Sequence, residues 1–329
     1  MTIKVGIPKT LFYYNYYPMI ETFFDELGVE VVTSDSTSRK VIDAGVREAL
    51  ADACVPIKVF FGHVQTIKDK VDYLFIPRVV CLNKKTIYCP KFLALSDMIK
   101  HSLDGLPEII DNRIDVRGNH FAVWKTFYHI GKRFSNSKCK IFKAYLKAKG
   151  NLSKYQDLVK EGYLPSVAMT ILKNNNSKQK MSHNYSLRFA VLGYPYIVYD
   201  NYVSVNLLTK LNHLGVETVT LEQLPDTWVN KANTMLPKDM FWTFSDKVLR
   251  SSYHFFEHGG VDGIIHLTAF GCGPDSMVDK YMELKSKQYP DIPFMSVTID
   301  EHSGEAGLAT RLEAFVDMVK RKKEADVNA

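Results

Sequence analysis

Three of the five cysteines in the chain share one local context. Cys54, Cys89 and Cys272 are each followed within two residues by a proline and then by a helical pattern. Proline favours the first helical turn, because the N–H that it lacks would have no partner there. The pattern therefore predicts that all three sulfurs lie at helix N-termini, where unpaired N–H groups and the helix dipole favour a thiolate.

Three thiolates of this kind predict a joint metal site. Soft sulfur ligands favour zinc, copper(I) or an iron–sulfur cluster. Structural zinc commonly has local C-x-x-C pairs of ligands, and the chain contains no such pair. A [4Fe-4S] cluster held by three cysteines from distant loops, with one iron left open, suits the arrangement better. Spacing alone leaves the identity of the metal open.

The remaining two cysteines and two histidines are weaker candidates for residues of a functional site. Cys81 follows the strand-like segment YLFIPRVV and is a reserve ligand, because an internal repeat places it near the position of Cys272. Cys139 lies in a lysine-rich helical pattern without proline and is expected to pack as a small apolar residue. His63, in a helical pattern, and His266, in a buried strand, are expected to be structural.

A second group of polar residues, Asp300, Glu301 and His302, follows the apolar strand pattern PFMSVTI. In a parallel sheet this is the edge where ligands bind, so Glu301 and His302 are candidate catalytic residues that could donate a proton. The alternative is ordinary helix-start chemistry, since acids favour a first turn and Thr310 with Glu313 has capping-box spacing. Both interpretations stay open.

A faint internal duplication predicts the fold that positions these residues. A G-x-P turn opens a strand–helix pattern at Gly6 and again at Gly193, and each pattern ends at a glycine, Gly28 or Gly215, after the same interval. The segments VDYLFIP and VDGIIHL then repeat a second buried strand. Such βαβ units predict an α/β protein with two Rossmann- or flavodoxin-like parallel-sheet domains related by a weak internal repeat.

The sequence between the two halves has a different pattern of apolar and polar residues. From about His120 to Lys173, apolar residues recur at helical spacing with lysines on the outer face, which predicts two or three helices. The polar segment NNNSKQKMSHN, from Asn174, reads as a linker. The expected organisation is an N-terminal α/β domain over residues 1–118, a helical connection over 119–183 and a C-terminal α/β domain over 184–329.

Composition limits the classes of function. With 46% apolar and 24% charged residues, the 329-residue chain is typical of globular proteins. A net charge of +6 is small for this length and implies neither a nucleic-acid groove nor a membrane surface. No apolar run approaches the length of a membrane span, and the N-terminus has no signal-peptide pattern. An odd number of cysteines and no signal favour a reducing, cytoplasmic location.

Longer motifs add a family resemblance. The segments ACVPIKVFFGHV, YCPKFLALSDMI, GIIHLTAFGCGPDS and TIDEHSGEAGLATRLEAFVDM, with the opening GIPKTLFYYNYYPMIETFFDELGVEVV, run from the first strand pattern to the last helical one. They resemble the 2-hydroxyacyl-CoA dehydratase-like proteins, in the branch related to acyl-CoA dehydratase activases (CoA-substrate-specific activase-like, DUF2229).

The resemblance implies a [4Fe-4S] cluster, single or paired across a dimer, with ligands at Cys54, Cys89 and Cys272. It also implies an oxygen-sensitive redox or lyase-type component of anaerobic metabolism, which receives a low-potential electron from an ATP-hydrolysing activator and acts on an acyl-CoA or another small molecule. A non-catalytic iron–sulfur or zinc protein of the same system is the alternative. The chain has no G-x-x-x-x-G-K-[ST] and no G-x-G-x-x-G motif, so an ATPase is not expected.

Overall fold

Contacts divide the chain of the computed structural model into two units, which are described one at a time. The structure describes residues 2–83, 85–118, 121–174, 185–232, 234 and 236–327. The first unit comprises Met1–Val159, Tyr163–Ser177 and Phe241–Thr243, and the second comprises Lys160–Gly162, Lys178–Met240 and Phe244–Ala329. Residues 175–184, which are all of the predicted linker after Asn174, lie outside the described residues.

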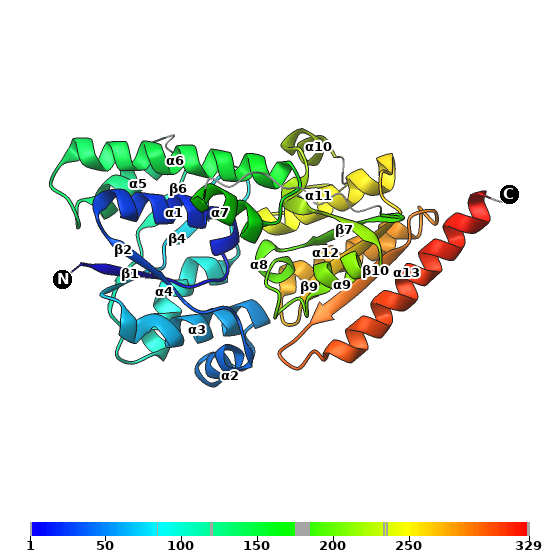
Figure 1. Cartoon of the computed structure of the whole chain (residues 1–329), viewed down its shortest axis with the longest axis horizontal. Helices are drawn as coiled ribbons and strands as arrows, with labels where there is room; N and C mark the ends of the chain where they lie inside the picture. Colours follow the sequence, from blue (N-terminus) through cyan, green and yellow to red (C-terminus); the bar gives the residue numbers. More distant parts are fainter. Residues whose placement is uncertain are drawn as a thin grey trace. The chain divides into compact units, whose positions relative to one another are not determined.

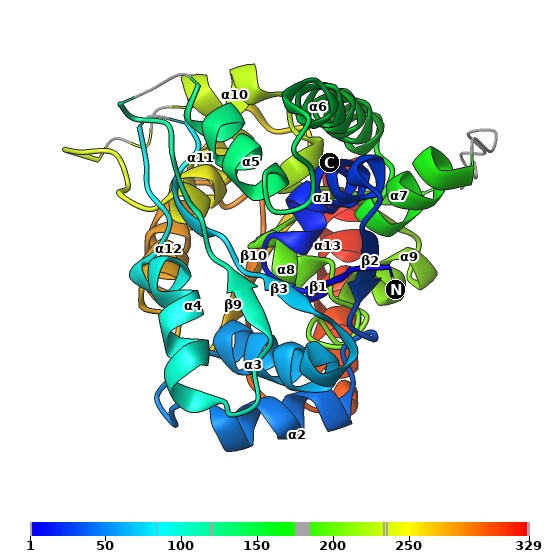
Figure 2. The ribbon, with the colours of Figure 1, turned by 90° about the vertical axis from the view of Figure 1, so that its left-hand side faces the viewer.

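A four-stranded parallel sheet in the order β2-β1-β3-β5 forms the centre of the first unit, and β4 pairs with β6 in a second, two-stranded sheet. The strands are β1 (Lys4–Ile7), β2 (Glu30–Thr33), β3 (Tyr73–Phe75), β4 (Arg78–Cys81), β5 (Glu108–Ile110) and β6 (Arg113–Asp115). The helices are α1 (Tyr13–Leu27), α2 (Arg39–Glu48), α3 (Val55–Ile67), α4 (Pro90–Ser102), α5 (Ala122–Gly131), α6 (Lys138–Lys160) and α7 (Pro165–Asn174), with the short 3₁₀ turn η1 (Lys68–Lys70). Figure 2 shows α1, α5 and α6 on one side of the sheet and α2 and α3 on the other.

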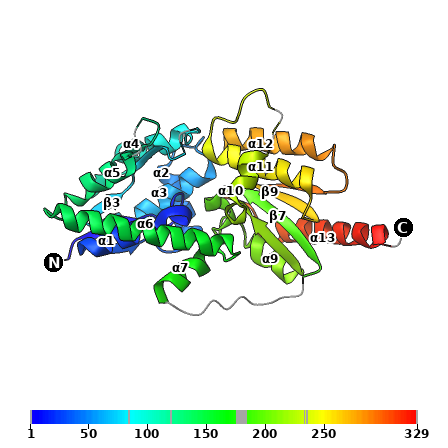
Figure 3. The same ribbon diagram turned by 90° about the horizontal axis from the view of Figure 1, so that it is seen from above.

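The second unit has a parallel sheet in the order β10-β9-β7-β8 (Figure 1). Its strands are β7 (Leu187–Gly193), β8 (Val216–Thr220), β9 (Gly263–Ala269) and β10 (Phe294–Ile299). Its helical elements are α8 (Pro195–Val198), α9 (Leu207–His213), η2 (Leu221–Gln223), α10 (Asp226–Lys231), α11 (Thr243–His258), α12 (Gly273–Ser286) and α13 (Glu305–Val327). Figure 3 shows α11 and α12 on one side of this sheet and α9 and α13 on the other. Among the described helices, none combines the length and apolar character needed to cross a bilayer.

The two sheets have the same topology, which confirms the predicted Rossmann- or flavodoxin-like α/β fold. In each, the first strand of the unit lies between the second and the third strand of the repeat, and the fourth lies beside the third. Gly28 and Gly215 end the first helical segments with φ of +83° and +78°, a left-handed conformation that glycine adopts without strain. The predicted duplication therefore extends to strand order and to individual backbone positions.

The same pair of hydrogen bonds occurs in both units, at the start of the first strand. In the first unit, the backbone N–H of Lys4 donates to Asp72 Oδ2 over 2.8 Å and the Asp72 N–H donates to the Lys4 carbonyl over 3.0 Å. In the second unit, Arg188 and Asp262 repeat both bonds at 2.8 Å and 2.7 Å. The V-D dipeptide of the repeat thus joins the first strand of each unit to its neighbour.

We expect Asp72→Ala and Asp262→Ala each to lower the free energy of unfolding by about 1 kcal/mol, because each removes the acceptor of one backbone hydrogen bond. Asp72→Asn retains an acceptor oxygen and should recover most of that loss. Asp262→Asn should recover less, because it also removes the ion pair of Asp262 Oδ1 with Lys323 Nζ at 2.7 Å. Urea unfolding followed by far-UV circular dichroism measures the difference. Equal loss in the alanine and asparagine variants would show that the charge, and not the hydrogen bond, carries the effect.

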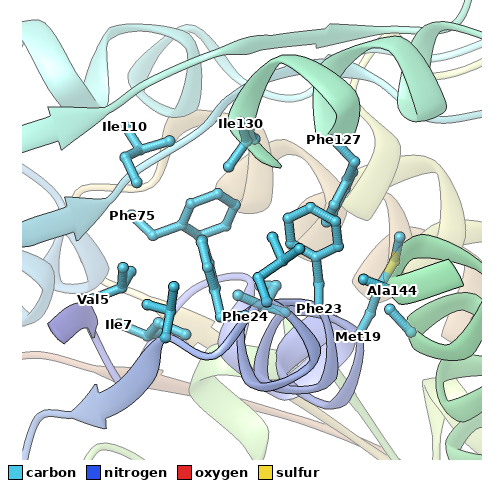
Figure 4. Close-up of a cluster of buried hydrophobic side chains, with 14 of the residues drawn as sticks. Val5, Ile7, Met19, Phe23, Phe24, Phe75, Ile110, Phe127, Ile130 and Ala144 are labelled. Carbon is cyan, nitrogen blue, oxygen red and sulfur yellow. The ribbon is translucent and has the colours of Figure 1, made fainter. Parts of the chain in front are cut away.

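Figure 4 shows the core of the first unit, where apolar side chains of the sheet meet α1 and α5. Phe23 and Phe24 of α1 are fully buried, and their rings contact Phe127 and Phe75 edge-on at centroid distances of 4.8 and 5.5 Å. The middle of the chain joins the same core, since Ile141, Ala144 and Ala148 of α6 are buried in it. The described residues of this middle stretch, 121–174, thus contain the three helices α5 to α7, in line with the two or three predicted.

Two glycines bring α2 and α3 into backbone contact on the other side of this sheet. A Cβ atom added to Gly45 would lie 1.8 Å from the carbonyl oxygen of Lys58, and one added to Gly62 would lie 1.9 Å from that of Val41. Only glycine permits such an approach. This contact positions α3, whose first turn carries Cys54.

The central strands of the second unit, β7 and β9, are buried almost throughout. They therefore read as nearly continuous apolar segments, as strands covered on both faces do. Phe189 of β7 contacts Phe315 of α13 at a ring-centroid distance of 5.4 Å, which places α13 against one face. Lys285 of α12 lies 3.4 Å from Glu257 of α11, which links the two helices on the other face.

Candidate metal site

Cys54 and Cys89 occupy the same kind of position in the first unit. Each is the residue that caps a helix, α3 or α4, and a proline stands at the first or second helical position after it. Their backbone conformations are nearly identical, with φ and ψ of −65° and 152° at Cys54 and −62° and 156° at Cys89. The predicted placement at helix N-termini is confirmed for both residues.

The two thiols interact electrostatically. Burial raises the pKa of both. At Cys54 the charge of Lys91 and the backbone N–H of Ile57 act against it, and at Cys89 the backbone N–H of Phe92 does. A Cys54 thiolate raises the pKa of Cys89 further, so the charge of one thiol acts on the other. Without a bound cation, both groups therefore favour the neutral thiol at neutral pH.

Aromatic side chains surround the Cys89 end of this pair. The ring of Phe12, in the turn after β1, contacts Tyr88 at 5.0 Å and Phe92 at 4.7 Å between centroids. Tyr88 precedes Cys89 and Phe92 lies one turn after it, so this aromatic cluster includes the residues that flank the cysteine in sequence. Phe12, which follows the first G-x-P turn, thus packs beside the start of α4.

Cys272 has the matching position in the second unit. It caps α12, with proline at the second helical position, and is separated from the end of β9 by Phe270 and Gly271. Its backbone N–H donates to the Ala269 carbonyl over 3.1 Å, which fixes the turn between strand and helix. The sulfur is therefore at a helix N-terminus and at the carboxyl end of a parallel strand, as predicted. Its participation in one site with Cys54 and Cys89 stays a prediction from the sequence.

Within neither unit do three or more described His, Cys, Asp or Glu side chains gather in a group able to hold a metal ion. No disulfide joins the five cysteines, all of which lie in the described part of the chain. Cys54 and Cys89 are two soft sulfur donors of the first unit, a type of donor that fits a soft metal. Their binding of a metal stays a prediction from the sequence.

Comparison with known proteins identifies the family. Residues 4–224, about two thirds of the chain, match the family described as CoA enzyme activase uncharacterised domain (DUF2229). The chain belongs to this family. The match contains both Cys54 and Cys89 and ends before Cys272, which lies outside the region that the family describes.

Other comparisons add little to this assignment. No curated protein matches the chain. A solved structure of a protein named as a proposed phosphosugar isomerase from Silicibacter pomeroyi aligns over 97% of this chain and 85% of its own, with 9% identity and a TM-score of 0.20. A likeness at that TM-score is no guide to fold or function.

Within this family member, the two remaining cysteines lie in unlike places. Cys81 ends β4 in the two-stranded sheet, fully buried between Val80 and Val116. The expectation that it occupies a position like that of Cys272 is wrong, because Cys81 lies on a strand and Cys272 caps a helix. Cys139, expected to pack in the interior, is exposed on α6.

His63 of α3 is a buried structural residue, as expected. Its Nδ1 lies 2.8 Å from Ser34 Oγ and its Nε2 lies 2.9 Å from Thr37 Oγ1. Burial, and then the charge of Lys9, lower its pKa to about 4. The Ser34 hydroxyl also accepts the Lys9 N–H over 2.8 Å, so it can donate its own proton to Nδ1 of a neutral imidazole.

The acidic group after β10 forms a tight turn. Asp300 accepts the His302 N–H over 2.7 Å and the Ser303 hydroxyl over 3.1 Å. His302 is exposed and Glu301 partly buried at the carboxyl end of the strand, which leaves their catalytic role a prediction. The capping box expected at Thr310 is wrong, because α13 begins at Glu305 and the Thr310 hydroxyl donates to the Ala306 carbonyl inside the helix.

A buried charged cluster beside Cys272 is the feature that sequence reasoning missed. His266 of β9 is fully buried, with its Nδ1 2.6 Å from Asp279 and its Nε2 3.3 Å from Asp275. Both carboxylates belong to α12, at the third and seventh positions after Cys272. Their helical spacing, together with a histidine in an otherwise apolar strand, was the available signal.

Proposed function

We propose that the chain is an iron–sulfur protein that holds a [4Fe-4S] cluster through Cys54, Cys89 and Cys272. The observation that carries the proposal is the pair Cys54 and Cys89: a buried and a half-buried thiol that act on each other electrostatically and start two helices with nearly the same backbone conformation. Two such thiols are unfavourable as unpaired anions, and a soft cation removes that cost. Cys272 has the same Cys-Pro-helix context and is the third proposed ligand.

The helix starts would stabilise the negative charge of a sulfur-ligated cluster. The backbone N–H groups of Ile57 and Phe92 donate to the carbonyl oxygens of Cys54 and Cys89 in the first turn of each helix and also favour a thiolate there, and the charge of Lys91 acts on both thiols. N–H groups directed at cluster sulfurs, and burial, are among the features by which a protein sets a cluster's potential. Phe12, with Tyr88 and Phe92, would exclude water from the Cys89 side.

The proposed activity is that of a redox or lyase-type component in a coenzyme A system. A [4Fe-4S] cluster supplies one-electron chemistry at low potential, and an open iron can also bind an oxygen atom of a substrate. In this proposal a separate ATP-hydrolysing activator delivers the electron, and the substrate is an acyl-CoA or another small molecule. Glu301 and His302 are the proposed proton donors near the sheet's carboxyl edge.

Anaerobic purification followed by iron, acid-labile sulfide and zinc analysis tests the cluster. We expect about four irons and four sulfides per chain in the natural protein. Cys54→Ser, Cys89→Ser and Cys272→Ser should each lose most of this iron, because each removes a ligand. The visible absorption of the cluster should fall in parallel.

Cys139→Ser is the matched control, since Cys139 is exposed and lies within α6 rather than at a helix start; its iron content should equal that of the natural protein. Loss of iron on Cys81→Ser would indicate a site closed by a fourth protein ligand and favour an accessory, non-catalytic role. Zinc in place of iron, or unchanged metal content in all three ligand variants, would rule out the proposed redox function.

A further inference from the structure

The cluster of His266, Asp275 and Asp279 poses an electrostatic problem. His266 and Asp275 are both 0% exposed, so neither reaches solvent. No described group within hydrogen-bond geometry satisfies either carboxylate oxygen of Asp275 or the Nε2 atom of His266. A buried carboxylate without hydrogen bonds is strongly unfavourable unless a positive charge lies beside it. The nearest candidate is the His266 ring, whose Nε2 atom lies 3.3 Å from Asp275 Oδ1.

Asp279 contacts the other nitrogen of the His266 ring. Its Oδ1 lies 2.6 Å from His266 Nδ1, a short distance that fits a charge-assisted hydrogen bond. The Asp279 side chain is 25% exposed, so it is less costly to ionise than Asp275. One imidazole on β9 therefore meets two carboxylates that stand one helical turn apart on α12.

The location of the carboxylates ties this cluster to Cys272. In α3 and α4, the third residue after the capping cysteine is apolar, Ile57 or Phe92, and packs in the core. In α12 the corresponding residue is Asp275, and its burial requires a partner. The first turn of α12, which begins at Cys272, can therefore pack on β9 only when His266 compensates this charge.

We propose that His266 is a positioning residue for Cys272: its imidazolium pairs with Asp275 and Asp279 and so holds the first two turns of α12 against β9. The pairing of His266 with Asp275 and Asp279 is called the clamp below. Its importance for a metal site rests on the proposed function, but the pairing itself is a property of the metal-free chain. Its failure can therefore be distinguished from failure of the cluster proposal.

The charge state of His266 gives the clamp a pH signature. Burial alone would lower the pKa of His266, but Asp275 and then Asp279 outweigh it and raise the pKa to about 9. The charged groups that act on the ring come from α12, while its register neighbours Leu192 of β7 and Ser296 of β10 are uncharged. Because the pKa is raised on folding, this stabilisation is present below about pH 6.5, the ordinary value, and is lost as the pH rises through about 9.

Alkylation of the metal-free chain by iodoacetamide, mapped by peptide mass spectrometry, tests the positioning role. In His266→Gln we expect Cys272 to react about five- to tenfold faster at pH 7, because the start of α12 opens more often. Cys54 and Cys89, in the other unit, serve as internal references and should react at unchanged rates. His63→Gln, which removes a buried histidine from α3, is the matched control and should leave the Cys272 rate unchanged.

The pH profile and a rescue variant separate this role from plain packing. The unfolding constants of the natural chain and of His266→Gln should differ most below about pH 6.5 and converge as the pH rises through about 9. Adding Asp275→Asn to His266→Gln should restore slow alkylation, since a neutral amide needs no imidazolium. Asp279→Asn, a milder change at a partly exposed position, tests the clamp if His266→Gln does not fold. A Cys272 rate within twofold of the natural chain in a folded variant, or a stability loss that does not vary with pH, would overturn the proposal.

Discussion

Gly62→Ala is expected to destabilise the first unit by about 3 kcal/mol, the upper end of the usual cost of overpacking. The added Cβ would lie 1.9 Å from the carbonyl oxygen of Val41, and backbone atoms cannot rotate away as a side chain can. Helices α2 and α3 must therefore separate. Gly45→Ala should have an effect of similar size, because its Cβ would meet the Lys58 carbonyl oxygen at 1.8 Å.

Urea unfolding of the two variants measures this cost, and the chain offers a matched control. Gly150 lies exposed within α6, and a Cβ added there meets nothing within 4 Å. Gly150→Ala should therefore stabilise the protein by about 0.5–1 kcal/mol, because alanine loses less backbone entropy in a helix. A cost below about 1 kcal/mol at Gly62 would mean that α2 can move without loss. Cys54 caps α3, so under the proposed function the iron content of Gly62→Ala should fall along with its stability.

Acid is expected to destabilise the first unit through His63. Its pKa of about 4 in the folded chain lies below the ordinary value of 6.5, because burial disfavours the imidazolium and Lys9 repels it. The unfolded chain therefore binds a proton that the folded chain does not. Stability should be constant above about pH 6.5 and fall by roughly 3 kcal/mol as the pH drops to about 4.

Urea unfolding between pH 7 and pH 4 measures this slope. His63→Gln should be less stable than the natural chain at pH 7, since it breaks at least one of the hydrogen bonds that the ring makes with Ser34 and Thr37. Its stability should also depend less on pH, so the two curves approach each other in acid. His101→Gln, at an exposed position in the last turn of α4, should retain the natural slope. Parallel curves for His63→Gln and the natural chain would contradict the assignment to His63.

Local signals in the sequence were sufficient for the architecture. The repeated Gly-to-Gly interval and the V-D dipeptides predicted two βαβ halves, because each describes how a strand enters a turn or pairs at its start. The two sheets share strand order, and the Asp72 and Asp262 hydrogen bonds recur. Proline after each of three cysteines correctly predicted helix starts, since proline acts on the residues next to it.

Features that depend on contacts between distant elements were beyond sequence reasoning. Gly45 and Gly62 read as ordinary helical positions until α2 and α3 are seen in backbone contact. Likewise, Cys139 was assigned to the interior from its residue type, although the face of α6 that carries it is exposed.

For the predicted ligands too, the local sequence determined some features and the tertiary structure decided others. The sequence by itself determined that Cys54, Cys89 and Cys272 stand at helix starts, because capping is decided by a few consecutive residues. Only the tertiary structure revealed that Cys54 and Cys89 are electrostatic neighbours and that His266 faces Asp275 and Asp279. These pairings join residues on different elements, and burial then sets their charges: the energy of such a pair depends on distance and solvent exposure, which no local pattern encodes.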